Sequence, residues 1–155
     1  MNQTYKHPKR KTKVVFVQLG SPTEPTTKAL RKYLKKFLGD PRVVDINPWL
    51  WKIILNFFVL PFRPKKSAKL YARIWDGKSF PLITNTRDFT NNVREELKKI
   101  DPNGHVEVNH AFLLSPPYVN EVYDSWEDDL KKGIGATKLL VIPMFPQYSE
   151  STIAS

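Results

Sequence analysis

Three short β-branched segments, separated by stretches with helical periodicity, constrain the fold of this chain more than any other feature. The segments are KVVFVQL (13–19), HVEVNHAFLL (105–114) and TKLLVIPMF (137–145). None is joined to the next by a turn short enough for a hairpin, and successive parallel strands need a long, usually helical, crossover. The sequence therefore predicts an α/β fold in which three buried strands form a parallel sheet flanked by helices.

Five helices are predicted between these strands, each from apolar residues that recur three or four positions apart. The second is expected to begin at Pro48 and end before Pro61, since proline lacks the N–H that a helix interior needs. The helices are expected along Leu30, Tyr33, Leu34, Phe37 and Leu38; over 48–60; over 65–75; along Phe89, Val93, Leu97 and Ile100; and along Val119, Val122, Tyr123, Trp126 and Leu130.

The loops after the strands are the expected ligand sites, because open α/β sheets bind ligands outside the carboxyl ends of their strands. The first loop, GSPTEPTT (20–27), can cradle an anion or cap a helix, and its two prolines, which lack N–H donors, favour capping. The terminal loop, PQYSESTIAS (146–155), offers an aromatic ring and several hydroxyls, which suit either a flat ligand with polar edges or an ordinary turn. The residues alone leave both readings of the terminal loop open.

The segment WLWKIILNFFVL (49–60) is apolar nearly all round its predicted helix and too short to span a bilayer. Basic residues follow it directly, at Arg63, Lys65, Lys66 and Lys69. Interfacial tryptophans with a basic flank are typical of contact with an acidic membrane surface or of a lip over a ligand site. A helix buried inside a larger protein is the alternative.

The chain carries 25 Lys and Arg against 15 Asp and Glu, a net charge of +10. This excess favours an anionic partner, or it simply reflects a solvated, flexible basic N-terminus over 1–12 ahead of a domain over 13–155. No recognised motif supports nucleic-acid binding. With no signal peptide, and no cysteine for disulfides or thiolate metal sites, a cytoplasmic location is expected.

Few residues suggest catalysis. His7, His105 and His110 have no metal-ligand spacing, and His110 is expected to be a hydrogen-bonded core residue within its strand. The acidic run at 127–129 is expected to be a solvated helix face. We therefore expect neither a metal site nor catalytic residues in this chain.

Four segments, in order and spacing, resemble signatures of ferrochelatase, the enzyme that inserts ferrous iron into a porphyrin. The segments are VQLGSP (17–22), FLGDPRVV (37–44), RPKKSAKLYARIW (63–75) and PQYSESTIAS (146–155). The resemblance implies a chelatase-like fold, with two Rossmann- or flavodoxin-like halves around a porphyrin cleft. This chain resembles the N-terminal half, so its implied partners are porphyrin, a membrane surface and the C-terminal half of the same protein.

The resemblance also implies site residues. The substrate-binding residues would be Leu19, Gly20, Arg73, Tyr148, Ser149, Ser151 and Thr152, and the apolar lip would comprise Trp49, Leu50, Trp51, Ile54, Phe57 and Phe58. The family's metal-site histidine and glutamate belong to the other half, so ferrous iron and porphyrin would be substrates of the whole enzyme and no cofactor is expected here.

Two departures from the family pattern bear on function. Gln18 replaces an asparagine before the first glycine loop, and FLLSPP (112–117) replaces the family's Met-Arg-Tyr-Gly-x-Pro. Leu113 and Leu114 thus stand where the family has an arginine and a tyrosine. The expected function is the N-terminal domain of a ferrochelatase, a haem-biosynthesis lyase, inactive alone. The alternative is a non-catalytic porphyrin- or membrane-binding module, and a flavin-binding domain is the weaker third reading because the first loop lacks a phosphate cradle.

Overall fold

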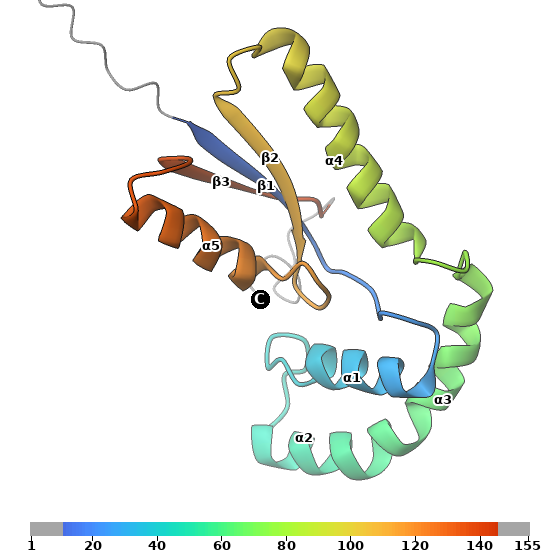
Figure 1. The fold of residues 1–155 in the computed structure, drawn as a ribbon. Helices are drawn as coiled ribbons and strands as arrows, with labels where there is room; N and C mark the ends of the chain where they lie inside the picture. Colours follow the sequence, from blue (N-terminus) through green and yellow to red (C-terminus); the bar gives the residue numbers. More distant parts are fainter. Residues whose placement is uncertain (1–10, 146–155) are drawn as a thin grey trace, which may run out of the picture.

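The structure, a computed structural model, describes residues 11–145. Three strands and five α-helices follow in the predicted order, four helices between the first two strands and one between the last two, with a π-helical and a 3₁₀ segment added (Figure 1). The elements are β1 (Thr12–Gln18), α1 (Thr27–Leu38), α2 (Pro48–Ile54), η1 (Leu55–Val59), α3 (Leu60–Tyr71), η2 (Ala72–Ile74), α4 (Pro81–Ile100), β2 (Val106–Phe112), α5 (Val119–Lys131) and β3 (Lys138–Pro143).

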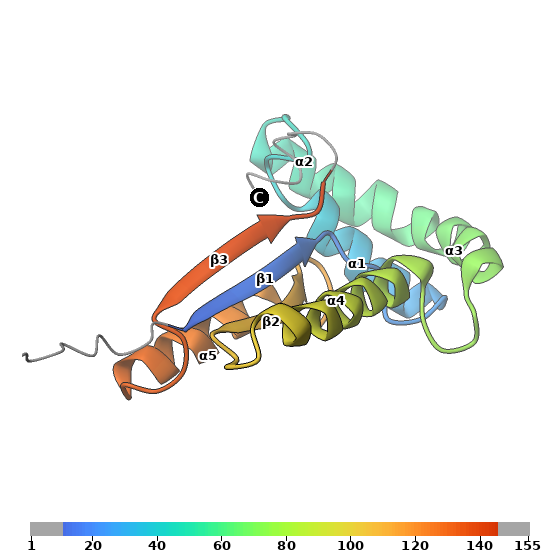
Figure 2. The same cartoon turned by 90° about the horizontal axis from the view of Figure 1, so that it is seen from above.

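The three strands form one parallel sheet with the order β2-β1-β3, so β1 is central. Val14 of β1 pairs with Val108 of β2 on one side and Leu140 of β3 on the other. Helices α4 and α5 lie on opposite faces of the sheet (Figures 1 and 2). The α/β fold is confirmed.

Successive side chains of β1 point to opposite faces of the sheet. Val15 and Val17 pack with Ala111 of β2 and with Val119 and Val122 of α5. Phe16 points to the other face, where its ring meets that of Phe89 on α4 edge-on, with centroids 5.1 Å apart. Each face of a strand carries every second side chain, so one apolar strand serves two helices.

A helical layer lies beyond the carboxyl ends of the strands. It consists of α1, α2, η1 and α3, and its buried centre is formed by Tyr33, Leu34, Leu38, Leu55 and Leu60. Thr26 caps α1, since its hydroxyl accepts a hydrogen bond from Ala29 N–H at 3.2 Å. The layer faces the strand ends where ligands bind in such folds.

Pro61 does not end the second helix, so the predicted break between 60 and 65 is wrong. The helix starting at Pro48 passes through the π-helical turn η1 and continues as α3 to Tyr71. Pro61 lies in the first turn of α3, directly after the π-helical turn, where the regular i to i−4 bonding is already interrupted. The predicted second and third helices therefore form one continuous, locally widened helix.

The expectation that the third strand is buried is wrong, and the predicted helix along Phe89 to Ile100 is present but buries other residues as well. Leu140 and Val141 of β3 are about half exposed (49% and 48%), because no other element within residues 11–145 covers the outer side of this edge strand. On α4, Phe89 and Ile100 are exposed, whereas Thr86 and Thr90 are buried. The threonine hydroxyls are satisfied locally, donating to the carbonyls of Leu82 and Thr86 at 2.7 Å.

Candidate ligand pocket at the carboxyl ends of the strands

The loops that follow β1 and β2 run side by side and are joined by hydrogen bonds. Leu114 N–H donates to Leu19 O at 2.9 Å, and Ser21 N–H donates to the hydroxyl of Ser115 at 3.3 Å. Gly20 lies between these contacts with φ of 93°, a conformation that side chains rarely adopt. The loop predicted to bind a ligand is thus held tightly against its neighbour.

Gln18 ties the ends of β1 and β3 together. Its side-chain amide donates to Met144 O at 3.1 Å, and its carbonyl accepts the N–H of Leu19 at 3.0 Å. Gln18 therefore has a structural role, since its side chain bridges two strand ends. In this way Gln18 fixes the backbone from which Leu19 projects.

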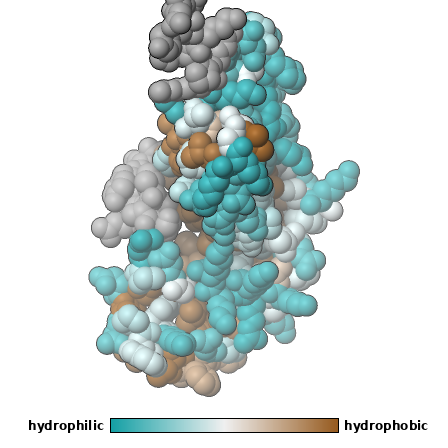
Figure 3. Space-filling model, turned by 60° about the vertical axis from the view of Figure 1, so that its left-hand side comes forward, coloured by the Kyte–Doolittle hydropathy of each residue, from teal (hydrophilic) through white to brown (hydrophobic). Residues whose placement is uncertain are grey.

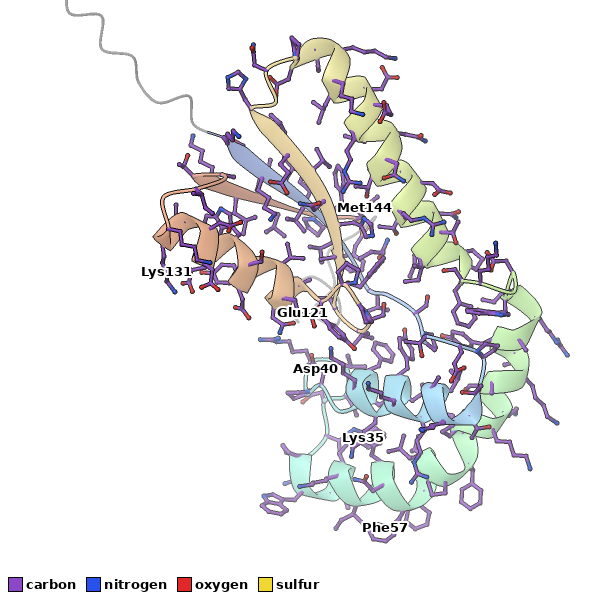
Figure 4. All side chains as sticks on the ribbon, viewed as in Figure 1. Lys35, Asp40, Phe57, Glu121, Lys131 and Met144 are labelled. Atoms are coloured by element: carbon purple, nitrogen blue, oxygen red, sulfur yellow. The ribbon has the colours of Figure 1, made fainter. Side chains whose placement is uncertain are left out.

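A small apolar pocket of about 130 Å³ opens beside these loops. We call it the leucine pocket. It is lined by Leu19, Phe37, Val43, Leu113 and Leu114, with Lys36 and Asp40 as the polar members. The segments that follow β1 and β2 supply its three leucines, and the last turn of α1 with the loop after it supplies the other four residues. Figure 4 marks Asp40 at the end of α1, on the side facing the start of α5.

The structure places the substrate-binding residues predicted from the resemblance in different surroundings. Leu19 lines the leucine pocket, and Gly20, the next residue in the chain, is buried but is not part of the lining. Arg73 is exposed on η2 and is not part of this pocket, so its role stays a prediction. Four predicted residues lie outside the described part of the chain: Tyr148, Ser149, Ser151 and Thr152.

Sequence reasoning missed Lys36, Phe37, Asp40 and Val43 as pocket residues. The segment FLGDPRVV (37–44) was noted as a family signature, and Phe37 as part of a helix stripe, but the segment also contains the end of α1 and the loop that leaves it. The position of this loop after a helix that leads toward the strand ends could have indicated that it borders the site. The sequence does not indicate which of its side chains line the pocket.

The predicted lip is largely exposed. Trp49, Leu50, Phe57 and Phe58 are 79%, 53%, 70% and 66% exposed, and Phe57 points away from the rest of the molecule (Figure 4). Figure 3 shows hydrophobic residues gathered at the end of the molecule formed by α2 and η1. The apolar surface of this helix is thus presented outward in the described part of the chain.

Two lip residues face inward instead. Trp51 and Ile54 are partly buried, and the Trp51 indole N–H donates to Leu38 O at 2.6 Å. Trp51 also lines a larger cavity of about 380 Å³, together with Val44, Leu55 and other residues. The two inward residues anchor the helix whose other side forms the exposed surface.

His110 differs from the expectation of a satisfied core residue. Its buried Nδ1 atom has no hydrogen-bond partner, and burial together with the nearby Arg94 and Arg87 lowers its pKa. By contrast, His105 Nδ1 lies 2.8 Å from Asp101 Oδ1, and this hydrogen bond lowers the pKa of the Asp101 carboxyl. Residues 11–145 contain no group of three or more His, Asp or Glu side chains placed so that they could hold a metal ion.

No helix within residues 11–145 combines the length and hydropathy needed to cross a membrane.

Comparison with known proteins gives one consistent result. A family model described as Ferrochelatase matches residues 11–155. The ferrochelatase of Idiomarina loihiensis is 42% identical over 142 residues, covering 92% of this chain and 37% of that protein. The ferrochelatase of Actinobacillus pleuropneumoniae serotype 5b is 40% identical, covering 92% of this chain and 42% of that protein. For that of Teredinibacter turnerae, the identity is 41%, covering 99% of this chain and 41% of that protein. The chain thus spans about two fifths of the length of these relatives.

Proposed function

Because this chain belongs to the ferrochelatase family, we propose that it serves as the N-terminal domain of an enzyme that inserts ferrous iron into a porphyrin. In this proposal the chain supplies one wall of the porphyrin cleft and the apolar lip beside it. The enzyme as a whole is a lyase of haem biosynthesis, and both iron and porphyrin are its substrates.

The leucine pocket is the observation that carries the proposal. Five apolar side chains converge at the carboxyl ends of β1 and β2, the edge at which open α/β sheets bind ligands. A pocket of about 130 Å³ holds only the edge of a tetrapyrrole ring, so it acts as a wall and not as an enclosing site. The opposite wall is assigned to the part of the relatives that this chain does not cover.

Metal insertion also needs groups that accept the pyrrole protons and deliver the iron. The described residues offer no cluster of such groups near the leucine pocket, where Asp40 is the one carboxylate and its Oδ1 already accepts the N–H of Arg42 at 2.8 Å. We therefore propose that the 155 residues alone do not insert iron. The proton acceptors would come from the C-terminal half.

The exposed surface of α2 and η1 supports a peripheral contact with a membrane on its cytoplasmic side. Partial burial of several aromatic rings contributes favourable free energy, since each large apolar side chain fully removed from water is worth about 1.5–3 kcal/mol. Arg63, Lys65, Lys66 and Lys69 follow on α3, all exposed, and each is worth about 1 kcal/mol near an anionic bilayer. A porphyrin could then pass between the bilayer and the cleft.

A non-catalytic porphyrin-binding module is the second candidate, and one observation favours it. Leu113 and Leu114 both line the leucine pocket, at the positions where the family pattern has an arginine and a tyrosine. An apolar pair keeps the affinity for an apolar macrocycle but removes a cation and a hydroxyl from the site. Such a wall binds without contributing polar groups to the reaction.

An iron-insertion assay on the 155-residue chain, with and without a C-terminal half taken from a relative, tests the proposal. The chain alone should show no metalloporphyrin formation, and the combination should restore it. Activity of the chain alone would contradict the assignment of the chemistry to the other half. Porphyrin binding without activity in the combination would favour the non-catalytic module.

A further inference from the structure

A second, smaller hollow adjoins the leucine pocket and has the opposite character. It measures about 40 Å³ and shares two residues, Lys36 and Leu114, with the leucine pocket. Its polar lining includes Lys32 and Lys36 of α1, Ser21 and Thr23 of the first loop, and Tyr118 at the start of α5. We call it the basic hollow. Its lining contains two lysines and no carboxylate.

The Lys36 ammonium group is held in place but not neutralised. Its Nζ atom lies 4.0 Å from the centroid of the Tyr118 ring, a cation–π distance. No carboxylate oxygen of residues 11–145 lies within 4.0 Å of it. Desolvation lowers the pKa of Lys36 and the charge of Lys32 adds to this, while Glu121 opposes it.

Two acidic residues close to this site, Glu121 and Asp40, already accept other hydrogen bonds. Glu121 Oε2 accepts the backbone N–H of Tyr118 at 3.0 Å, at the start of α5. Asp40 lines the leucine pocket but not the basic hollow, and its carboxylate accepts the N–H of Arg42. The Lys36 cation is therefore available to an anion that enters from the leucine pocket.

Size restricts what that anion can be. A cavity of about 10–15 Å³ holds a single water molecule, so the hollow of about 40 Å³ admits a carboxylate group but not an aromatic ring. The leucine pocket next to it accepts an apolar edge. Together the two spaces suit a molecule whose apolar ring carries a short carboxylate side chain.

We propose that the basic hollow is a carboxylate subsite, in which Lys36, placed by the ring of Tyr118 and assisted by Lys32, binds an acidic side chain of the porphyrin whose ring edge lies in the leucine pocket. This inference rests on the proposed porphyrin-binding function. It also accounts for the two leucines at 113 and 114. Lys36 from α1 and Tyr118 from the loop before α5 place a cation and a phenol next to Leu114. These two residues supply the polar groups that the leucines lack.

Porphyrin binding by the 155-residue chain tests the subsite, using a dicarboxylate porphyrin and its diester, which has the same ring without the charges. Lys36→Gln should weaken binding of the dicarboxylate about tenfold, the effect of losing one charge-assisted hydrogen bond near the surface, and leave the diester unchanged. Lys36→Arg should retain most of the affinity. Lys28→Gln is the matched control, because Lys28 is an exposed lysine on the same helix and lines neither space.

Three outcomes of these binding measurements distinguish the carboxylate subsite from the proposed function. Selective loss of the dicarboxylate supports the subsite. Equal affinity of Lys36→Gln and the unmodified chain, or equal loss for both porphyrins, overturns the subsite and leaves the proposed function standing. Failure of the unmodified chain to bind either porphyrin overturns the proposed function and the subsite with it. Matching melting temperatures establish that each variant is folded, and Lys32→Gln repeats the test with the second lysine.

Discussion

The backbone of Gly20 packs directly against the hydroxyl of Ser115, so the loop after β1 and the loop after β2 form one continuous surface. A Cβ atom at Gly20 would collide with this hydroxyl and would also approach the Cβ of Phe112 to 3.1 Å. The close approach holds Leu19 and Leu114, which line the leucine pocket, on neighbouring loops.

Gly20→Ala should destabilise the chain more than Gly77→Ala does. Both glycines have φ near 93–94°, so both variants bear backbone strain of about 1–3 kcal/mol, but nothing lies within 4 Å of a Cβ at Gly77. The contact with Ser115 should add at least about 1 kcal/mol to the cost at Gly20. Urea unfolding of the two variants measures the difference, and equal free energies of unfolding would show that the contact with Ser115 carries no cost.

Trp51→Phe should lower the free energy of unfolding by about 1–3 kcal/mol, because it leaves the Leu38 carbonyl without its donor at a partly buried position. Trp49→Phe is the matched control on the same helix. Its side chain is 79% exposed, so a change within about 0.5 kcal/mol is expected. If Trp49→Phe were the more damaging variant, the assignment of Trp51 as the inward anchor would be wrong.

His110 should make stability depend on pH in mildly acidic solution. Its pKa in the folded chain lies below the ordinary value of 6.5, so the unfolded chain takes up the proton first as the pH falls. The free energy of unfolding should therefore decrease from about pH 6.5 downwards, until the pH reaches the lowered pKa of the folded state. His110→Phe and His110→Gln should both flatten this part of the curve, and an unchanged slope in both variants would contradict the account.

Removing the outward rings of the lip should weaken membrane binding without affecting the fold. Phe57→Ser combined with Phe58→Ser should reduce sedimentation with vesicles containing anionic lipid by about tenfold or more, because two exposed aromatic side chains no longer enter the interface. Ile100→Ser on α4, at a residue that is 79% exposed, supplies the control for a general loss of surface apolarity. Equal reductions would argue against a specific role for α2 and η1.

Much of the fold could be predicted from the sequence because strands and helices have different periods. The three β-branched runs and the apolar spacing of α1 and α5 indicate their elements directly. Pro61 misled the prediction because a local rule about proline takes no account of the π-helical turn that precedes it. The exposure of Leu140 and Val141 depends on what packs on β3, which no property of that segment reveals.

The candidate site was only partly predictable, for a related reason. Leu19 could be placed at a strand end from the order of elements alone, whereas Lys36 and Tyr118 come from α1 and from the loop before α5, more than 80 positions apart in the sequence. Their contact is a product of tertiary packing. His110 was expected to be hydrogen-bonded because most buried polar atoms are, and its Nδ1 is an exception.

Porphyrin binding to the 155-residue chain and to Leu114→Glu, followed by the absorbance of the porphyrin, tests the central claim most directly. The variant places a carboxylate in the wall of the leucine pocket, whereas Leu70→Glu places one on the exposed surface of α3. We predict that the unmodified chain and Leu70→Glu shift the porphyrin spectrum with the same affinity, and that Leu114→Glu binds at least about tenfold more weakly. A folded chain that binds no porphyrin, or a Leu114→Glu variant that binds as well as the unmodified chain, would contradict the claim that this pocket is a wall of the porphyrin cleft.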